Sequence, residues 1–185
     1  MKNNMVTRDC IKIEEGKITT LVGERCCGMS SLLCEYANEY LKNNDGKILI
    51  LSDYMVGAMS LRNSLLFLDN DKSRIECKTT TDLMMGLVSK TYGMIIFDSP
   101  NIFNIENLSN MMLLRSQLKS KIIVGVTWEN IAFDKKVNKI IKSFFTNRSD
   151  YAYYISPTWA GPMIYEIENT LCEDTKNEIL ENLWK

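Results

Sequence analysis

Short apolar runs alternate along most of the chain with longer segments of helical period. Each run is continuous and lacks polar alternation, which is typical of strands covered on both faces. An alternation of strand, helix and strand predicts a mostly parallel sheet with helices on both faces. We expect Asp82 and Asn104 to be N-caps of two of the helices. The predicted strands are Ile18–Val22, Ile48–Leu51, Met94–Phe97 and Ile122–Val126, and the predicted helices are Ser30–Leu41, Gly57–Leu68, Thr80–Ser89 and Ile105–Leu118.

The pattern changes past residue 150, where the β-rich segments Tyr151–Ser156 and Met163–Glu168 flank a loop that begins and ends with proline. This order predicts an antiparallel hairpin added to the sheet. Residues 1–16 are polar and mixed, as in a short lead-in strand or arm, and residues 174–185 predict a final helix. Nothing repeats and no linker divides the 185 residues, so we expect one α/β domain.

Composition removes several classes of function. The 22 Lys and Arg nearly balance the 23 Asp and Glu, so no global field draws the chain to nucleic acid or membrane. Histidine is absent, which excludes Ser-His-Asp and Cys-His catalysis and His-ligated metals. The six cysteines form no C-x-x-C pair, which predicts reduced thiols in a cytoplasmic protein, or a nuclear one in a eukaryote or its virus. No apolar run approaches the roughly 18–20 residues of a membrane span, and no signal peptide is expected.

The first predicted strand runs directly into Gly23-Glu-Arg-Cys-Cys-Gly28-Met29-Ser30. This is the spacing of the phosphate-binding loop, G-x-x-x-x-G-K-[ST], with methionine at the lysine position. Two glycines let the backbone wrap a phosphate, and the helix N-terminus adds its dipole. Lysine neutralises the β- and γ-phosphates, and the hydroxyl of the next residue holds Mg²⁺. The alternative is a strand–helix turn with no ligand.

Three further segments fit one known family. The second strand ends in Leu51-Ser-Asp-Tyr-Met55, Gly93-Met-Ile-Ile-Phe-Asp98 is an apolar run closed by aspartate, and Val124–Trp128 ends the next strand. With the loop and the closing hairpin, their order over residues 16–172 resembles the RecA-like core of replicative helicases of the DnaB type. The resemblance implies a RecA-like fold with ATP and Mg²⁺ as ligands. It implies that Gly23, Arg25, Gly28, Met29, Ser30 and Asp98 line the nucleotide site, and that Ser30 and Asp98 hold the metal.

The chain departs from that family at most catalytic positions. Met29 replaces the phosphate lysine, and Tyr54 stands where a glutamate would activate water. Trp128 replaces the glutamine that senses the γ-phosphate, while Glu168 and Thr170 replace a lysine and an arginine finger. An arginine finger alone is worth about 10³–10⁵ in rate. These coincident losses favour a pseudo-ATPase that binds ATP and Mg²⁺ weakly or not at all.

Two alternatives stay open. Arg25 as a substitute cation and Asp53 as a base would make a divergent but active ATPase or helicase-like motor, with Asp53 and Asp98 as its catalytic candidates. A plain interaction module that kept only the fold is the other. For Asp98 itself, the simpler interpretation is a carboxylate that caps the turn before Pro100.

A basic stretch follows the predicted strand Ile122–Val126. Four lysines fall mostly off an apolar stripe at helical spacing, namely Lys135, Lys136, Lys139 and Lys142. They predict either a DNA phosphate-contacting surface or a solvated helix face. The sequence as a whole therefore favours a degenerate RecA/DnaB-like domain of DNA replication, recombination or repair. We expect its partners to be proteins, such as a RecA-like or helicase assembly, and single-stranded DNA.

Overall fold

The computed structural model describes residues 5–24, 26–68, 71–84, 92–98, 119–128, 149–157 and 162–167. The predicted helix at 105–118, the four lysines of the basic stretch and the C-terminal helix lie outside these residues. So do Arg25, Asn104, Glu168 and Thr170.

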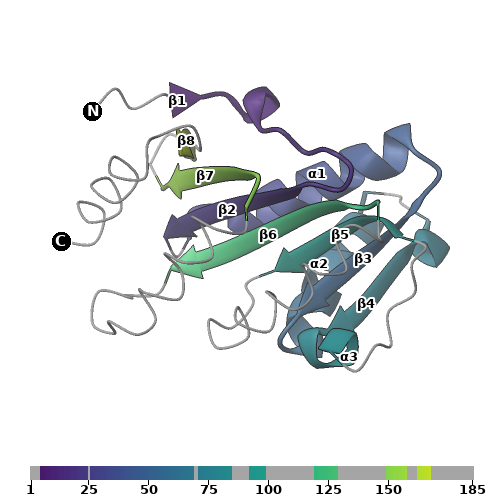
Figure 1. Cartoon of the computed structure of the whole chain (residues 1–185). Helices are drawn as coiled ribbons and strands as arrows, with labels where there is room; N and C mark the ends of the chain where they lie inside the picture. The colour runs from purple at the N-terminus through teal and green to yellow at the C-terminus, as the bar shows by residue number, and fades with distance from the viewer. Residues whose placement is uncertain are drawn as a thin grey trace.

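Eight strands of the described residues form one sheet in the order β1-β8-β7-β2-β6-β5-β3-β4 (Figure 1). The six strands from β7 to β4 are mutually parallel, while β8 runs antiparallel to β7, and β1 antiparallel to β8. The predicted α/β class and the added hairpin are therefore confirmed. The strands are β1 (Met5–Val6), β2 (Ile18–Glu24), β3 (Lys47–Ser52), β4 (Ile75–Thr79), β5 (Tyr92–Asp98), β6 (Lys121–Trp128), β7 (Tyr151–Ser156) and β8 (Met163–Ile167).

One strand was not expected. In β4, Ile75, Cys77 and Thr79 alternate with Glu76 and Lys78, so the segment has no continuous apolar run. It lies at the sheet edge beside β3, where one long side of the strand has no neighbour among the described strands. An edge strand tolerates charged residues, and these discourage pairing with another chain. The period-two alternation was the available signal.

Three α-helices are described, and two of them begin earlier than predicted. α1 (Met29–Asn43) begins one residue early and α2 (Met55–Leu66) two residues early, while α3 (Thr80–Met84) begins at the predicted residue. No helix among the described residues is long and apolar enough to span a membrane.

Asp82 is not the N-cap of α3. The Thr79 hydroxyl accepts from the Asp82 backbone N–H at 3.2 Å, and the Asp82 carboxylate accepts from the Thr79 backbone N–H at 2.8 Å. This reciprocal pair is a capping box, in which the acidic residue stands three positions after the cap. The predicted cap was wrong by those three residues.

α1 and α2 pack together on one face of the sheet. The core between them and the strands contains Leu33 and Ala37 from α1, Leu65 from α2, and Ile50 and Ile96 from the sheet, all fully buried. Residues of the other parity on the central strands, such as Leu49 and Ile95, are also buried. Burial on both faces explains why these strands read as unbroken apolar runs.

Arg74 fastens the end of α1 to the start of β3. Its Nη1 donates to the Leu41 carbonyl at 2.9 Å, its Nη2 donates to the Gly46 carbonyl at 2.9 Å, and Asn44 supplies a third carbonyl. The Leu41 carbonyl is one of those that the last turn of a helix leaves without an intrahelical partner, while Asn44 and Gly46 lie just past the end of α1. A cation at this position also complements the negative end of the helix dipole.

We expect Arg74→Ala to lower the free energy of unfolding by about 2–3 kcal/mol, because charge-assisted bonds to three carbonyls are lost together. Urea denaturation measures this change. The exposed Lys72, in the same turn, is the matched control, and Lys72→Ala should change stability by less than about 0.5 kcal/mol. Equal effects of the two substitutions would contradict the role given to Arg74.

Candidate functional site

The loop between β2 and α1 ends in a left-handed glycine. Gly28 has φ +84° and ψ 16°, and it is the N-cap of α1 without a side-chain capping bond. The first intrahelical bond runs from the Leu32 N–H to the Gly28 carbonyl at 3.0 Å. The preceding N–H groups of the first turn therefore have no intrahelical acceptor. Together with the helix dipole they suit an anion.

Gly23 has a different role, which is to allow Cys27 and the backbone of β7 to approach β2 closely. A Cβ at this position would clash with the Cys27 Sγ and stand 2.9 Å from the Ile155 carbonyl oxygen on β7. Cys27 is 3% exposed, so the loop folds back onto the strand that precedes it. Between them Cys26 is exposed and has φ +64°, a conformation that costs a non-glycine residue about 1 kcal/mol or more.

Met29 lies in the hydrophobic core and is 4% exposed. Its Cγ and Sδ stand 3.2 Å from the point where a Cβ on Gly125 would be, so the side chain lies across β6. Gly125 pairs in register with Leu21 on β2 and with Asp98 on β5. The residue at the lysine position of the loop thus fills the space between α1 and the sheet with an apolar side chain.

Asp98 and Ser30 lie on the same side of the sheet. Asp98 has the parity of Met94 and Ile96, which face α1, and it is 8% exposed at the carboxyl end of β5. Ser30 is exposed in the first turn of α1. The carboxyl ends of β2, β6 and β5 meet at this edge, where the chain leaves β2 and crosses over to β3 (Figure 1). Open α/β sheets bind ligands at such a switch point.

Asp53 and Tyr54 follow β3, which β6 and β5 separate from β2. The Thr80 hydroxyl, which is buried, donates to the Asp53 Oδ1 at 2.7 Å. This bond ties the end of β3 to the start of α3, so Asp53 has a structural role. Tyr54 is the extended N-cap residue of α2 and is 74% exposed.

ATP and Mg²⁺ are the usual ligands of this kind of loop, and the described residues fit them in part. The uncapped start of α1 offers backbone donors that suit a phosphate, and Ser30 and Asp98, which would hold the metal, lie on the same side of the sheet. The described part of the loop supplies no cation, because Met29 is apolar and turned into the core. The described residues therefore suit the binding of a phosphate, but they supply no cation to stabilise the charge that develops during its transfer.

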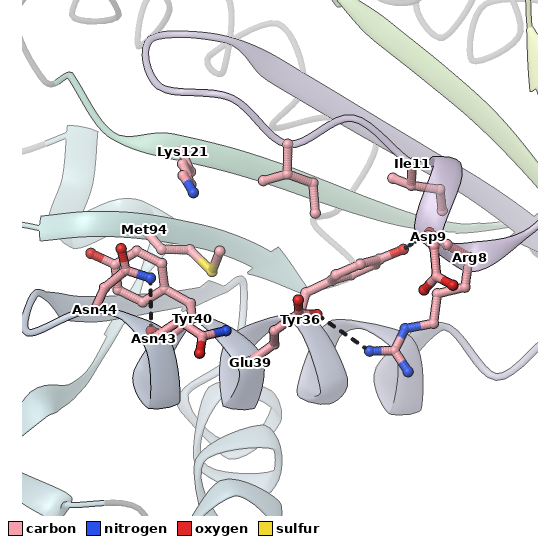
Figure 2. A pocket seen from close by; sticks show the side chains of 11 residues that line it. Arg8, Asp9, Ile11, Tyr36, Glu39, Tyr40, Asn43, Asn44, Met94 and Lys121 are labelled. Atoms are coloured by element: carbon pink, nitrogen blue, oxygen red, sulfur yellow. Dashed lines mark hydrogen bonds and ion pairs between the residues drawn. The ribbon is translucent and has the colours of Figure 1, made fainter.

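A hollow of about 490 Å³ lies at the amino ends of β5 and β6, away from this loop (Figure 2). Two of its four charged lining residues, Arg8 and Glu39, pair with each other. Arg8 pairs with Glu35 at 2.6 Å and with Glu39 at 3.5 Å, and its backbone carbonyl accepts from the Tyr36 hydroxyl at 3.1 Å. The lining residues are Arg8, Asp9, Ile11, Ile13, Tyr36, Glu39, Tyr40, Asn43, Asn44, Met94 and Lys121.

These contacts hold the lead-in arm against α1. Burial raises the pKa of the Tyr36 phenol, so the hydroxyl stays protonated and keeps donating at physiological pH. Further along the arm, the Tyr153 hydroxyl accepts from the Lys12 backbone N–H at 3.0 Å. Sequence reasoning missed this hollow, because its walls come from the arm, one helix and two strands that are far apart in the chain.

The sheet order, the loop after β2 and the crossover helices define a RecA-like α/β fold. Among solved structures, the chain is similar to the flagellar accessory protein FlaH from Methanocaldococcus jannaschii. The likeness covers 90% of this chain and 88% of that one, with a TM-score of 0.58 and 16% identity. At this identity it shows the fold alone. No family model matches the sequence, and no curated protein matches it either.

We expect Gly23→Ala to lower the free energy of unfolding by about 1–3 kcal/mol, because the added methyl meets Cys27 and the Ile155 carbonyl. Cys27→Ala removes one of these two obstacles. It should therefore cost less in the Gly23→Ala background than in the natural chain, which a double-mutant cycle by urea denaturation measures. Additive effects would show that Cys27 does not pack on Gly23.

Proposed function

We propose that this chain is a degenerate RecA-like domain of DNA metabolism that acts through protein partners and DNA rather than by hydrolysing ATP. The observation that carries the proposal is the buried, apolar Met29 at the position where the phosphate-binding loop has its lysine. The resemblance to DnaB-type helicase cores supports replication, recombination or repair as the setting. The partners we propose are a RecA-like or helicase assembly and single-stranded DNA bound by the four lysines of the basic stretch.

Phosphoryl transfer depends on charge placed where the transition state needs it. Met29 lies across Gly125, so its side chain gives the phosphates neither charge nor a hydrogen-bond donor. Asp53 is the candidate base of the alternative active ATPase. It accepts a hydrogen bond from Thr80 and so links the end of β3 to the start of α3. Both observations favour a domain without turnover.

Binding without hydrolysis is compatible with the same loop. Gly28 and the uncapped first turn of α1 retain the backbone donors for a phosphate, and Ser30 and Asp98 retain the oxygens for Mg²⁺. Without a cation these donors hold a triphosphate weakly, since they do not offset its charge. The divergent active ATPase remains the competing hypothesis, with Arg25 as its cation.

A direct test is equilibrium binding of a fluorescent ATP analogue, with and without Mg²⁺, to the natural chain and to Met29→Lys. We expect the natural chain to bind with a Kd of about 1 mM or weaker, and Met29→Lys to bind at least about tenfold more tightly. Met29→Leu is the control, since it keeps the apolar contact and adds no charge. Because Met29 is buried, urea denaturation must first show that each variant is folded.

Micromolar, Mg²⁺-dependent binding by the natural chain would contradict the proposal if it came with ATP turnover. Asp98→Asn would then have to abolish that turnover to support the active ATPase.

Cys26 offers a second measurement in the natural chain. It is exposed within the phosphate loop, while Cys10 is exposed far from it, in the short 3₁₀ turn Arg8–Cys10. We expect about 0.1 mM Mg²⁺·ATP, well below the Kd expected for the natural chain, to leave the alkylation rates of both thiols nearly unchanged, and to slow Cys26 alone in Met29→Lys. Mass spectrometry after timed alkylation measures both rates. Selective protection of Cys26 in the natural chain would show a nucleotide-filled loop.

A further inference from the structure

The hollow at the amino ends of β5 and β6 has a size and a lining that suit a small molecule. Its volume of about 490 Å³ falls within the roughly 300–1,000 Å³ of small-molecule sites. Its apolar lining comes from Met94 on β5 and from Ile11 and Ile13 on the lead-in arm. Two aromatic residues, Tyr36 and Tyr40, line it from successive turns of α1 (Figure 2). Such a site holds the body of a ligand by apolar contact, and a few polar groups orient it.

Contacts with the rest of the chain fix both aromatic side chains. The Tyr36 hydroxyl donates to the Arg8 carbonyl at 3.1 Å. The end of the Tyr40 side chain lies beside Gly46 and Gly93, and a side chain at either glycine would collide with the Tyr40 hydroxyl. Side chains that are already ordered lose little conformational freedom when a ligand binds, so more of the contact energy contributes to affinity.

Lys121 brings an ammonium group to this apolar lining. As the first residue of β6 it pairs with Met94 and has the parity of Ile123, so it lies on the face of the sheet that α1 covers. It is partly buried, and its Nζ lies 5.9 Å from the centroid of the Tyr40 ring. Among the described residues, no carboxylate forms an ion pair with it. A cation–π contact replaces only part of the hydration that a partly buried ammonium loses.

The other charged groups around the hollow do not neutralise this ammonium. Arg8 pairs with Glu35 and Glu39, which engages both of these carboxylates. Asp9 is exposed, so water solvates its carboxylate, and it lies with Arg8 at the end of the hollow away from Lys121 (Figure 2). An acidic group on a ligand is therefore the complement that Lys121 lacks among the described residues.

We propose that this hollow binds a small organic anion, with its apolar body against Tyr36, Tyr40 and Met94 and its acidic group on Lys121. Carboxylates, sulfonates and phosphate monoesters share this chemistry. The hollow is lined by the lead-in arm, α1, β5 and β6, so a bound anion joins the arm to the rest of the fold. It lies at the opposite ends of the parallel strands from the loop after β2, and the inference does not rest on the proposed function.

The test uses two fluorescent dyes that differ in charge. The probe is 8-anilinonaphthalene-1-sulfonate, and N-phenyl-1-naphthylamine has the same apolar body without the sulfonate. Fluorescence titration of the full chain measures both affinities, and we expect the sulfonate dye to bind one site per chain with a Kd below about 100 µM. Lys121→Gln should raise that Kd about five- to tenfold, because a charge-assisted contact is lost. It should change the Kd of the uncharged dye by less than about twofold.

Two further variants locate the bound dye. Ile13→Trp fills the hollow with a larger side chain, so it should weaken the binding of both dyes at least about fivefold. Lys119→Gln removes an exposed lysine two residues before Lys121 and is the matched control, which should leave both affinities unchanged.

Urea denaturation first shows that each variant is folded, and Lys121→Gln decides alone if Ile13→Trp does not fold. A natural chain that does not bind the sulfonate dye would overturn the proposal. Binding that Lys121→Gln or a folded Ile13→Trp leaves unchanged would overturn it as well, since the dye would then lie elsewhere. An equal effect of Lys119→Gln would show that the dye responds to net charge and not to this hollow.

Discussion

The packing of the first turn of α1 against β6 is the contact on which the rest of the structure depends. Met29 lies across Gly125, where a larger residue would also meet the Leu33 side chain, and this places the start of α1 above the carboxyl ends of the strands. The same contact decides the chemistry. A buried methionine stabilises the helix–sheet layer through apolar burial, whereas a lysine here would have to reach out of the core to serve a phosphate.

Different kinds of interaction stabilise the carboxyl ends and the amino ends of the strands. At the carboxyl ends, Cys27 packs closely on Gly23, and Thr80 is hydrogen-bonded to Asp53. At the amino edge, ion pairs and phenol hydroxyls hold the lead-in arm to α1 and β7. The described residues Cys27 and Met29 of the loop that resembles a phosphate site thus pack against the sheet. This packing supports the proposal of a domain that does not turn over ATP.

Much of the fold followed from the sequence, because burial on both faces leaves continuous apolar runs that mark central strands. Four such runs became β2, β3, β5 and β6, and the paired segments past residue 150 became the antiparallel hairpin β7–β8. The edge strand β4 was missed, since one of its sides has no neighbour among the described strands and it carries charges. The phosphate-binding loop was recognised from the fixed spacing of its glycines. The sequence did not show whether the side chains of the loop point into the core or toward a ligand.

The residue types were determined by the sequence alone: no histidine, methionine for lysine, and two glycines five positions apart around the loop-to-helix turn. These facts set which functional groups are available to the chemistry of the site. The tertiary structure decided where the groups lie. It buried Met29, bonded Asp53 to Thr80, brought Asp98 to the α1 face and left Val56 and Phe67 exposed. Each of these outcomes depends on neighbours distant in the chain, which local patterns do not encode.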